Sequence, residues 1–332
     1  MKHTPHSIHV KDRETLDNGF SSGWGFHFQP SEEYVIDCHT HTDFEGSAED
    51  FKALLDKWFF YTEAYRQQKI VLFVETESQM ESMAELMKID DRVQWMLYLP
   101  ADKPRFEWVK KSKKLGACGL KIHSHTIMKG EVPFECFYSP DWQGIFKFIE
   151  DNDMPALWHV TQRVSYSPYH GGGFNAYFSE GQKKGINVTN EMLLKQLCDV
   201  LEAYPKLNII GAHQLYLGIP ALSKLFDKYP NLYIDSSVGY FVRWCDTIYE
   251  DDRELYYEFF NKYPDKILFG TDSHIAPNAI GEYQKETFCN HLRFIHQLRL
   301  PYDVLEMVCH KNAERLLKIP PSSSSRKYNT RP

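Results

Sequence analysis

The sequence lacks several features that mark whole classes of protein. Its seven cysteines are scattered and form no C-x-x-C pair, which excludes a zinc ribbon and a disulfide framework. No apolar run approaches the roughly 18 residues that a membrane-spanning helix needs. Basic residues are not in excess, since the formal net charge is −7, and this argues against a general nucleic-acid binder. A small molecule is therefore the expected partner.

The two ends of the chain look different from its middle. The first twenty residues are polar and lack the apolar stretch of a secretory signal, so we expect a cytoplasmic protein. Residues 1–32 are predicted to be an N-terminal extension. Residues 319–332 contain a Pro-Pro-Ser run that cannot build a core, which predicts a disordered tail. Residues 33–318 are predicted to form one domain.

Within the middle region, short apolar segments alternate with longer amphipathic ones. Each apolar segment is rich in β-forming residues, and helix-like stretches such as 50–67, 79–88, 141–152 and 190–204 lie between them. Strict alternation predicts parallel strands joined by helical crossovers. Eight such units in fewer than 300 residues predict a distorted (β/α)8 TIM-like barrel. The predicted strands are 34–41, 70–75, 93–99, 118–124, 155–161, 207–213, 232–237 and 266–272.

Chemically active side chains stand at the carboxyl ends of five of these strands, where barrel enzymes carry their active sites. The first strand ends in His39 and His41, and the fourth in Lys121 and His123. The fifth, sixth and eighth end in His159, His213 and Asp272. Imidazole and carboxylate groups suit Zn²⁺ and similar divalent ions. Their convergence at one end of a barrel predicts a metal site.

The two-residue period of a strand predicts which way these side chains point. His39 and His41 share a face with Asp37, and Ile36, Cys38 and Thr40 are expected to face the helices. By the same period, His213 shares a face with Ile209 and Gly211, and Asp272 with Leu268 and Gly270.

Several segments resemble the amidohydrolase superfamily, in the branch that includes aminocarboxymuconate-semialdehyde decarboxylase and resorcylate decarboxylases. They are IDCHTH (36–41), GLKIH (119–123), ALWHV (156–160), IIGAH (209–213), KYPNLYIDSS (228–237), FGTD (269–272) and HKNAERLL (310–317). The resemblance implies one divalent metal ion, Zn²⁺ in preference to Mn²⁺, held by His39, His41, His159 and Asp272. It also implies His213 as the catalytic imidazole and gives Asp272 a second role in proton transfer.

The substrate-binding residues are predicted from position and charge. Lys121 and His123 follow the fourth strand, and Arg163 and Arg243 follow the fifth and seventh. Guanidinium groups pair with carboxylates, so a small carboxylated and cyclic or unsaturated substrate is expected. Lys121 has an alternative interpretation as a carboxylated lysine that bridges two metals. The nearby aromatic segments leave a homodimer open.

Several functions remain open at this point. Hydrolysis through a metal-activated water is favoured, with non-oxidative decarboxylation as the alternative. HTHTDFEG (39–46) and GTDSH (270–274) also resemble PHP phosphoesterases, in which His274 would be a ligand. A non-catalytic barrel would require broken ligand positions that this sequence does not have. A metal-free lactonase of the same superfamily would keep part of the histidine pattern.

Overall fold

The computed structural model describes residues 34–62, 65–161, 176–237, 250–277 and 282–321. The predicted extension 1–32 and most of the predicted tail lie outside these residues. The strands are β1 (Val35–His41), β2 (Gln67–Val74), β3 (Val93–Pro100), β4 (Gly119–His123), β5 (Ala156–His159), β6 (Ile209–Gly211), β7 (Leu232–Asp235), β8 (Ile267–Leu268) and β9 (Ser273–His274). All pair in parallel, in the order β8-β7-β6-β5-β4-β3-β2-β1-β9.

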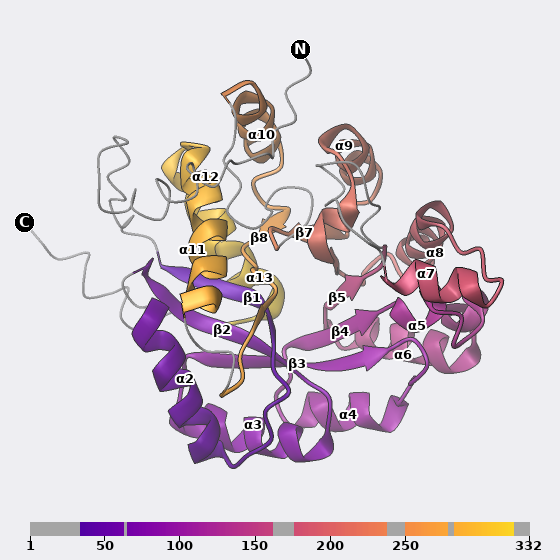
Figure 1. Ribbon diagram of the computed structural model, residues 1–332, viewed down its shortest axis with the longest axis horizontal. Helices are drawn as coiled ribbons and strands as arrows, with labels where there is room; N and C mark the ends of the chain where they lie inside the picture. The colour runs from indigo at the N-terminus through magenta and orange to yellow at the C-terminus, as the bar shows by residue number, and fades with distance from the viewer. Residues whose placement is uncertain (1–33, 63–64, 162–175, 238–249, 278–281, 322–332) are drawn as a thin grey trace, which may run out of the picture.

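Helices connect the strands, and most of them lie outside the curled sheet (Figure 1). They are α2 (Ala48–Thr62), α3 (Glu77–Ile89), α4 (Phe106–Lys114), α5 (His125–Met128), α6 (Pro140–Asp151), α7 (Ala176–Lys183), α8 (Asn190–Ala203), α9 (Ile219–Lys228), α10 (Glu250–Lys262), α11 (Glu282–Gln297), α12 (Tyr302–Glu306) and α13 (Asn312–Leu317). Local signals set several starts: Thr76 and Gln79 form a capping box on α3, and Ser139 caps α6 before Pro140. The predicted TIM-barrel-like α/β fold is confirmed.

The eighth predicted strand, 266–272, is reduced to the short β8, and a second short strand, β9, follows directly after it. β8 pairs with β7, and β9 pairs with β1, so one continuous segment contacts both edges of the sheet. Asp272 lies between the two strands with a φ of 61°, a left-handed conformation that interrupts regular strand geometry. The segment 267–274 therefore links the seventh strand to the first, as closure of a barrel requires.

Two hydrophobic clusters divide the core. The larger packs the outer faces of the strands against the helices, with Trp95 and Trp158 among its fully buried members. The smaller lies inside the sheet and takes residues from most strands, including Ile36, Cys38, Val71, Phe73, Met96, Leu157, Ile210 and Leu268. Residues of α13 join this inner cluster beside Tyr34, which precedes β1. α13 thus packs near the amino end of β1, whereas His39 and His41 lie at the carboxyl end of that strand.

The inner cluster corrects the predicted faces of β1. Ile36 and Cys38 were expected to face the helices, but they pack inside the barrel. The pairing of β1 with β2 shifts register between Asp37 and Thr40, as at a β-bulge. That shift lets residues on both sides of it point inward, so Cys38 lies below His39 rather than behind it. Alternation read along the sequence cannot detect such a bulge.

Candidate metal centre

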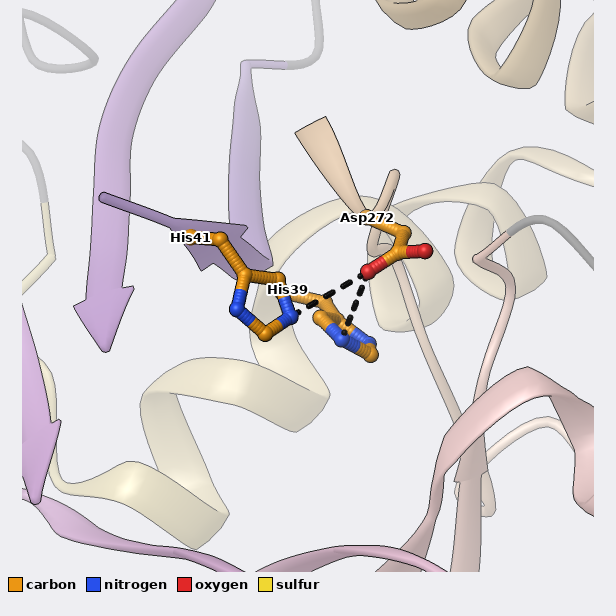
Figure 2. Close-up of side chains that lie close together, drawn as sticks. All are labelled: His39, His41 and Asp272. Atoms are coloured by element: carbon orange, nitrogen blue, oxygen red, sulfur yellow. Dashed lines mark ion pairs between the residues drawn. The ribbon is translucent and has the colours of Figure 1, made fainter. Parts of the chain in front are cut away.

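Three of the predicted metal ligands come together at the carboxyl ends of β1 and β8. The Nε2 atoms of His39 and His41 lie 3.2 Å and 3.3 Å from the same carboxylate oxygen, Oδ1 of Asp272 (Figure 2). The three ligand atoms lie within 4.8 Å of one another. In the part of the chain that the structure describes, no other group of three or more His, Cys, Asp or Glu side chains meets this closely.

This donor set suits a divalent cation. Two imidazole nitrogens and one carboxylate oxygen form a typical ligand set for Zn²⁺, and also serve other first-row divalent ions. His39 is fully buried, whereas the side chains of His41 and Asp272 are 30% and 27% exposed, so the set opens on one side. Catalytic metal sites keep an open position of this kind for water or substrate.

Asp272 is held at the site by a left-handed backbone conformation and by hydrogen bonds to residues that are distant in the sequence. Its N–H donates to the carbonyl of His39 at 2.9 Å, which fixes the left-handed residue against β1. Next to it, the hydroxyl of Thr271 donates to the buried carboxyl of Asp37 at 2.6 Å. Burial raises the pKa of Asp37 to about 7. Leu268, Gly270 and Asp272 all face the inside of the barrel, as predicted, although regular strand geometry ends before Asp272.

Asp235, at the end of β7, is a functional residue that the sequence analysis missed. It is fully buried, and its Oδ2 lies 2.5 Å from Nδ1 of His39. Its Oδ1 accepts hydrogen bonds from the backbone N–H of His213 at 2.9 Å and from the hydroxyl of Ser237 at 2.7 Å. Burial raises the pKa of Asp235, but His39 and these donors outweigh it and lower that pKa to about 2. Its place at the end of the seventh predicted strand was the available signal.

His213 and His159 form a second pair of imidazoles beside the first. Nε2 of His213 lies 3.1 Å from Nδ1 of His159, and the ring centroids are 4.5 Å apart. The ring of His213 is also 5.0 Å from that of His39. His159 is therefore not in the closest ligand set, although it was predicted to be a ligand. Its Nε2 is buried and has no hydrogen-bond partner among the described residues.

His213 is held in place by an unusual turn. His213, Gln214, Leu215 and Tyr216 all have φ between 49° and 57°, and consecutive left-handed residues other than glycine are costly. Hydrogen bonds offset this strain: Nε2 of Gln214 donates to the carbonyls of Asp235 and Ser237, at 2.9 Å and 2.7 Å. The prediction that His213 shares a strand face with Ile209 is therefore wrong, since Ile209 packs outward and Ile210 inward.

Lys121 brings a positive charge to the centre. The side chain is fully buried, and its Nζ lies 2.9 Å from Nε2 of His39 and 4.9 Å from the ring centroid of Phe73. Burial lowers the pKa of Lys121 to about 8. His123, on the same strand, stacks on His159 with ring centroids 4.0 Å apart. Both predicted substrate-binding residues of β4 are therefore close to the predicted ligands.

The imidazoles differ in charge because their surroundings differ. Burial lowers the pKa of His213 to about 3 and that of His41 to about 4, and moves the pKa of His159 well below its ordinary value. For His39, burial and Lys121 lower the pKa, but the carboxylates of Asp235 and Asp272 outweigh them and raise it. These shifts favour the neutral ring for His213, His41 and His159, and a neutral ring is the form that binds a metal.

The remaining predicted residues divide into two groups. Arg163 and Arg243 lie outside the described residues. His274, a ligand in the phosphoesterase alternative, has its Nε2 3.5 Å from Oδ1 of Asp43 and does not belong to the close ligand set.

Among the described helices, none is both long enough and apolar enough to cross a membrane.

Comparison with known proteins identifies the family. The model of the amidohydrolase family matches residues 36–319. The chain is similar in fold to 2,6-dihydroxybenzoate decarboxylase from Rhizobium, with 17% identity over 86% of this chain and 99% of that one, and a TM-score of 0.55. It is also similar to dihydroxybenzoic acid decarboxylase from Polaromonas sp. JS666, solved with manganese and 2-nitroresorcinol, with 14% identity over 87% and 98% and a TM-score of 0.54.

A third similar structure is an uncharacterised TIM-barrel protein from Bordetella bronchiseptica, with 14% identity over 86% of this chain and 98% of that one, and a TM-score of 0.55. No curated protein sequence matches the chain. The family model spans every predicted ligand and both strands that close the barrel. The chain is therefore an enzyme that belongs to the amidohydrolase family.

Proposed function

We propose that the chain is a metal-dependent carboxy-lyase that removes CO₂ from a small, flat carboxylate without an oxidant. The observation that supports this most is the position of Lys121, whose buried ammonium lies 2.9 Å from a predicted metal ligand. A cation beside a metal centre favours a substrate that brings negative charge to the same place. Two of the structurally similar proteins are decarboxylases of dihydroxybenzoates, which are substrates of this kind.

We assign the metal to His39, His41 and Asp272, with His159 as the fourth ligand. Zn²⁺ is the first choice for this donor set, and Mn²⁺ is the alternative. A bound divalent ion would orient the substrate and polarise its oxygen atoms as a Lewis acid. The proposal involves one metal ion and keeps Lys121, whose Nζ lies 2.9 Å from Nε2 of His39, as a cation at the site rather than as a carboxylated bridge between two metals.

The chain's own residues would do the remaining work. Lys121 and His123 bind the carboxylate, with Arg163 and Arg243 as the further predicted contacts. Asp272 directs Oδ1 at both imidazoles, so its other oxygen, Oδ2, is left to carry a proton. In the reaction, the bond between the carboxyl carbon and its neighbour breaks and the electron pair stays on that neighbour. The neighbouring carbon then takes one proton, and CO₂ leaves.

Hydrolysis is the second candidate, and Asp272 and His213 favour it. A carboxylate and a neutral imidazole near the ligands could take a proton from water and orient a substrate carbonyl. We rank it second because the buried Lys121 cation and the two structurally similar decarboxylases support a carboxylate substrate more directly. Burial raises the pKa of Asp272, but His213, His39 and His41 outweigh burial and lower it well below the ordinary value, so this shift favours neither reaction.

The test is a product analysis on the metal-loaded protein. Zn²⁺- and Mn²⁺-loaded samples are incubated with a panel of hydroxybenzoates and unsaturated dicarboxylates, and separately with lactones and anilides. Decarboxylation releases one CO₂ for each substrate consumed and, in D₂O, places one deuterium on the carbon that lost the carboxyl group. Hydrolysis in ¹⁸O-labelled water places the label in the product instead. Turnover of lactones or anilides alone would reject the carboxy-lyase.

A matched pair of variants ties the reaction to the centre. His41→Gln removes a predicted ligand, whereas His274→Gln removes a partly exposed imidazole two residues beyond Asp272 and outside the close ligand set. Metal content by elemental analysis is expected near one ion per chain in the wild type and in His274→Gln, and well below one in His41→Gln. Two ions per chain would instead support a carboxylated Lys121.

A further inference from the structure

Asp235 stands at the meeting point of the two imidazole pairs. Its Oδ2 contacts His39, and its Oδ1 contacts His213 and Ser237. Two of these partners are donors, the backbone N–H of His213 and the hydroxyl of Ser237, and the third is the ring nitrogen Nδ1 of His39. A second backbone N–H, that of Ser237, points at Oδ1 from 3.2 Å. A carboxylate surrounded in this way acts only as an acceptor, so its partners must be donors.

The first consequence concerns His39. Because Asp235 accepts from Nδ1, that nitrogen carries a proton, and Nε2 is the nitrogen whose lone pair is available. Lys121 supports the same assignment from the other side of the ring, since an ammonium can only donate and lies 2.9 Å from Nε2. Nε2 is also the atom that faces Asp272 and His41 in the close ligand set.

The second consequence passes through Ser237 to His159. The hydroxyl of Ser237 has one hydrogen and gives it to Asp235 at 2.7 Å, so towards His213, 3.1 Å away, its oxygen must accept. Nδ1 of His213 therefore carries the proton of the neutral ring, and Nε2 of His213 accepts from Nδ1 of His159 at 3.1 Å. This leaves the lone pair on Nε2 of His159, the buried atom without a partner among the described residues.

We propose that Asp235 is the positioning residue of the metal centre: it sets the tautomers of two predicted ligands, His39 directly and His159 through Ser237 and His213. One carboxylate on β7 thus turns Nε2 of both rings into a metal-binding atom. Carboxylates that hold a ligating histidine in this way contribute roughly 10- to 100-fold to metal affinity. The inference rests on the metal site proposed above.

The experiment measures tautomers and metal affinity on the full-length chain. Long-range ¹H–¹⁵N spectra of ¹⁵N-histidine-labelled wild type, metal-free and Zn²⁺-loaded, report which nitrogen of each ring is protonated. Signals are assigned with His39→Gln and His159→Gln. We expect both rings to carry the proton on Nδ1 in both samples. A proton on Nε2 of metal-free His159 would overturn the proposal without any variant having to fold.

Three variants then separate the direct effect of Asp235 on His39 from its indirect effect on His159 through Ser237 and His213. Asp235→Asn must keep its oxygen towards His213 and Ser237, so its NH₂ group faces His39, which then carries its proton on Nε2. We expect a 10- to 100-fold weaker Zn²⁺ and Mn²⁺ affinity by calorimetry. Ser237→Ala should change the His213 and His159 signals only, with a smaller loss of affinity. Ser236→Ala removes a buried hydroxyl whose hydrogen-bond partners, among the residues that the structure describes, are backbone atoms of Gly270, and should change neither.

The outcomes distinguish this inference from the proposed function. If wild type binds no Zn²⁺ or Mn²⁺, the metal site itself is wrong, whatever the tautomers are. If wild type binds metal and Asp235→Asn binds it equally well with unchanged histidine spectra, Asp235 is not a positioning residue. Loss of affinity in Asp235→Asn with wild-type melting of the metal-free protein supports the inference.

Discussion

Gly270 packs against both His39 and Asp235. A larger side chain at this position should therefore lower the stability of the fold and the metal affinity of the centre. A Cβ at position 270 would lie 2.9 Å from Cβ of His39 and 3.3 Å from Cβ of Asp235. The backbone cannot easily retreat, because Gly270 donates to the hydroxyl of Ser236 at 3.2 Å and accepts from it at 3.3 Å. The contact between His39 and Asp235 must therefore give way.

Overpacking of this kind costs about 1–3 kcal/mol. We therefore expect Gly270→Ala to lower the free energy of unfolding of the metal-free protein by that amount, measured by urea denaturation. Since the bond between His39 and Asp235 is displaced, Zn²⁺ affinity should also fall by about tenfold or more. The two effects are measured separately, the first without metal and the second by calorimetry on folded protein.

Gly144→Ala is the matched control. Gly144 lies within α6, and a Cβ there meets nothing within 4 Å. Alanine in the middle of a helix is more favourable than glycine by about 0.5–1 kcal/mol, so this variant should be more stable and should bind Zn²⁺ like wild type. Wild-type stability and wild-type Zn²⁺ affinity in Gly270→Ala would refute the packing argument.

Three further changes test other parts of the site and the fold. Asp272→Asn should lose most bound metal by elemental analysis and reduce turnover at least about 100-fold, because ligand and proton carrier are lost together. Lys121→Met should raise KM for a carboxylate substrate while metal content stays near one ion per chain; an unchanged KM would remove Lys121 from the substrate site. His296→Gln should flatten the loss of stability in acid. Burial lowers the pKa of His296 from 6.5 to about 4. The unfolded chain therefore takes up this proton first, and the folded protein loses up to about 3 kcal/mol as the pH falls from about 6.5 to about 4. The midpoints of urea unfolding of His296→Gln and of wild type, measured across this pH range, test this prediction.

The sequence by itself determined the order of elements and the end of the barrel that carries the chemistry. Strand and helix patterns depend on neighbouring residues, so the predicted strand 34–41 appears as Val35–His41 and the predicted helix 190–204 as Asn190–Ala203. The carboxyl ends of parallel strands share one side of the sheet by topology alone. His39, His41 and Asp272 could therefore be brought together without knowing their exact directions.

Only the tertiary structure decided where each side chain points and what holds it there. The register shift in β1 and the left-handed turn at His213 break the two-residue alternation, and the left-handed Asp272 ends the regular strand. All three are fixed by hydrogen bonds between distant strands, such as that of Thr271 to Asp37, 234 residues apart. Asp235 escaped notice for the same reason: its partners His39 and His213 become neighbours only when the sheet curls. A local pattern carries no information about bonds that the closed barrel creates.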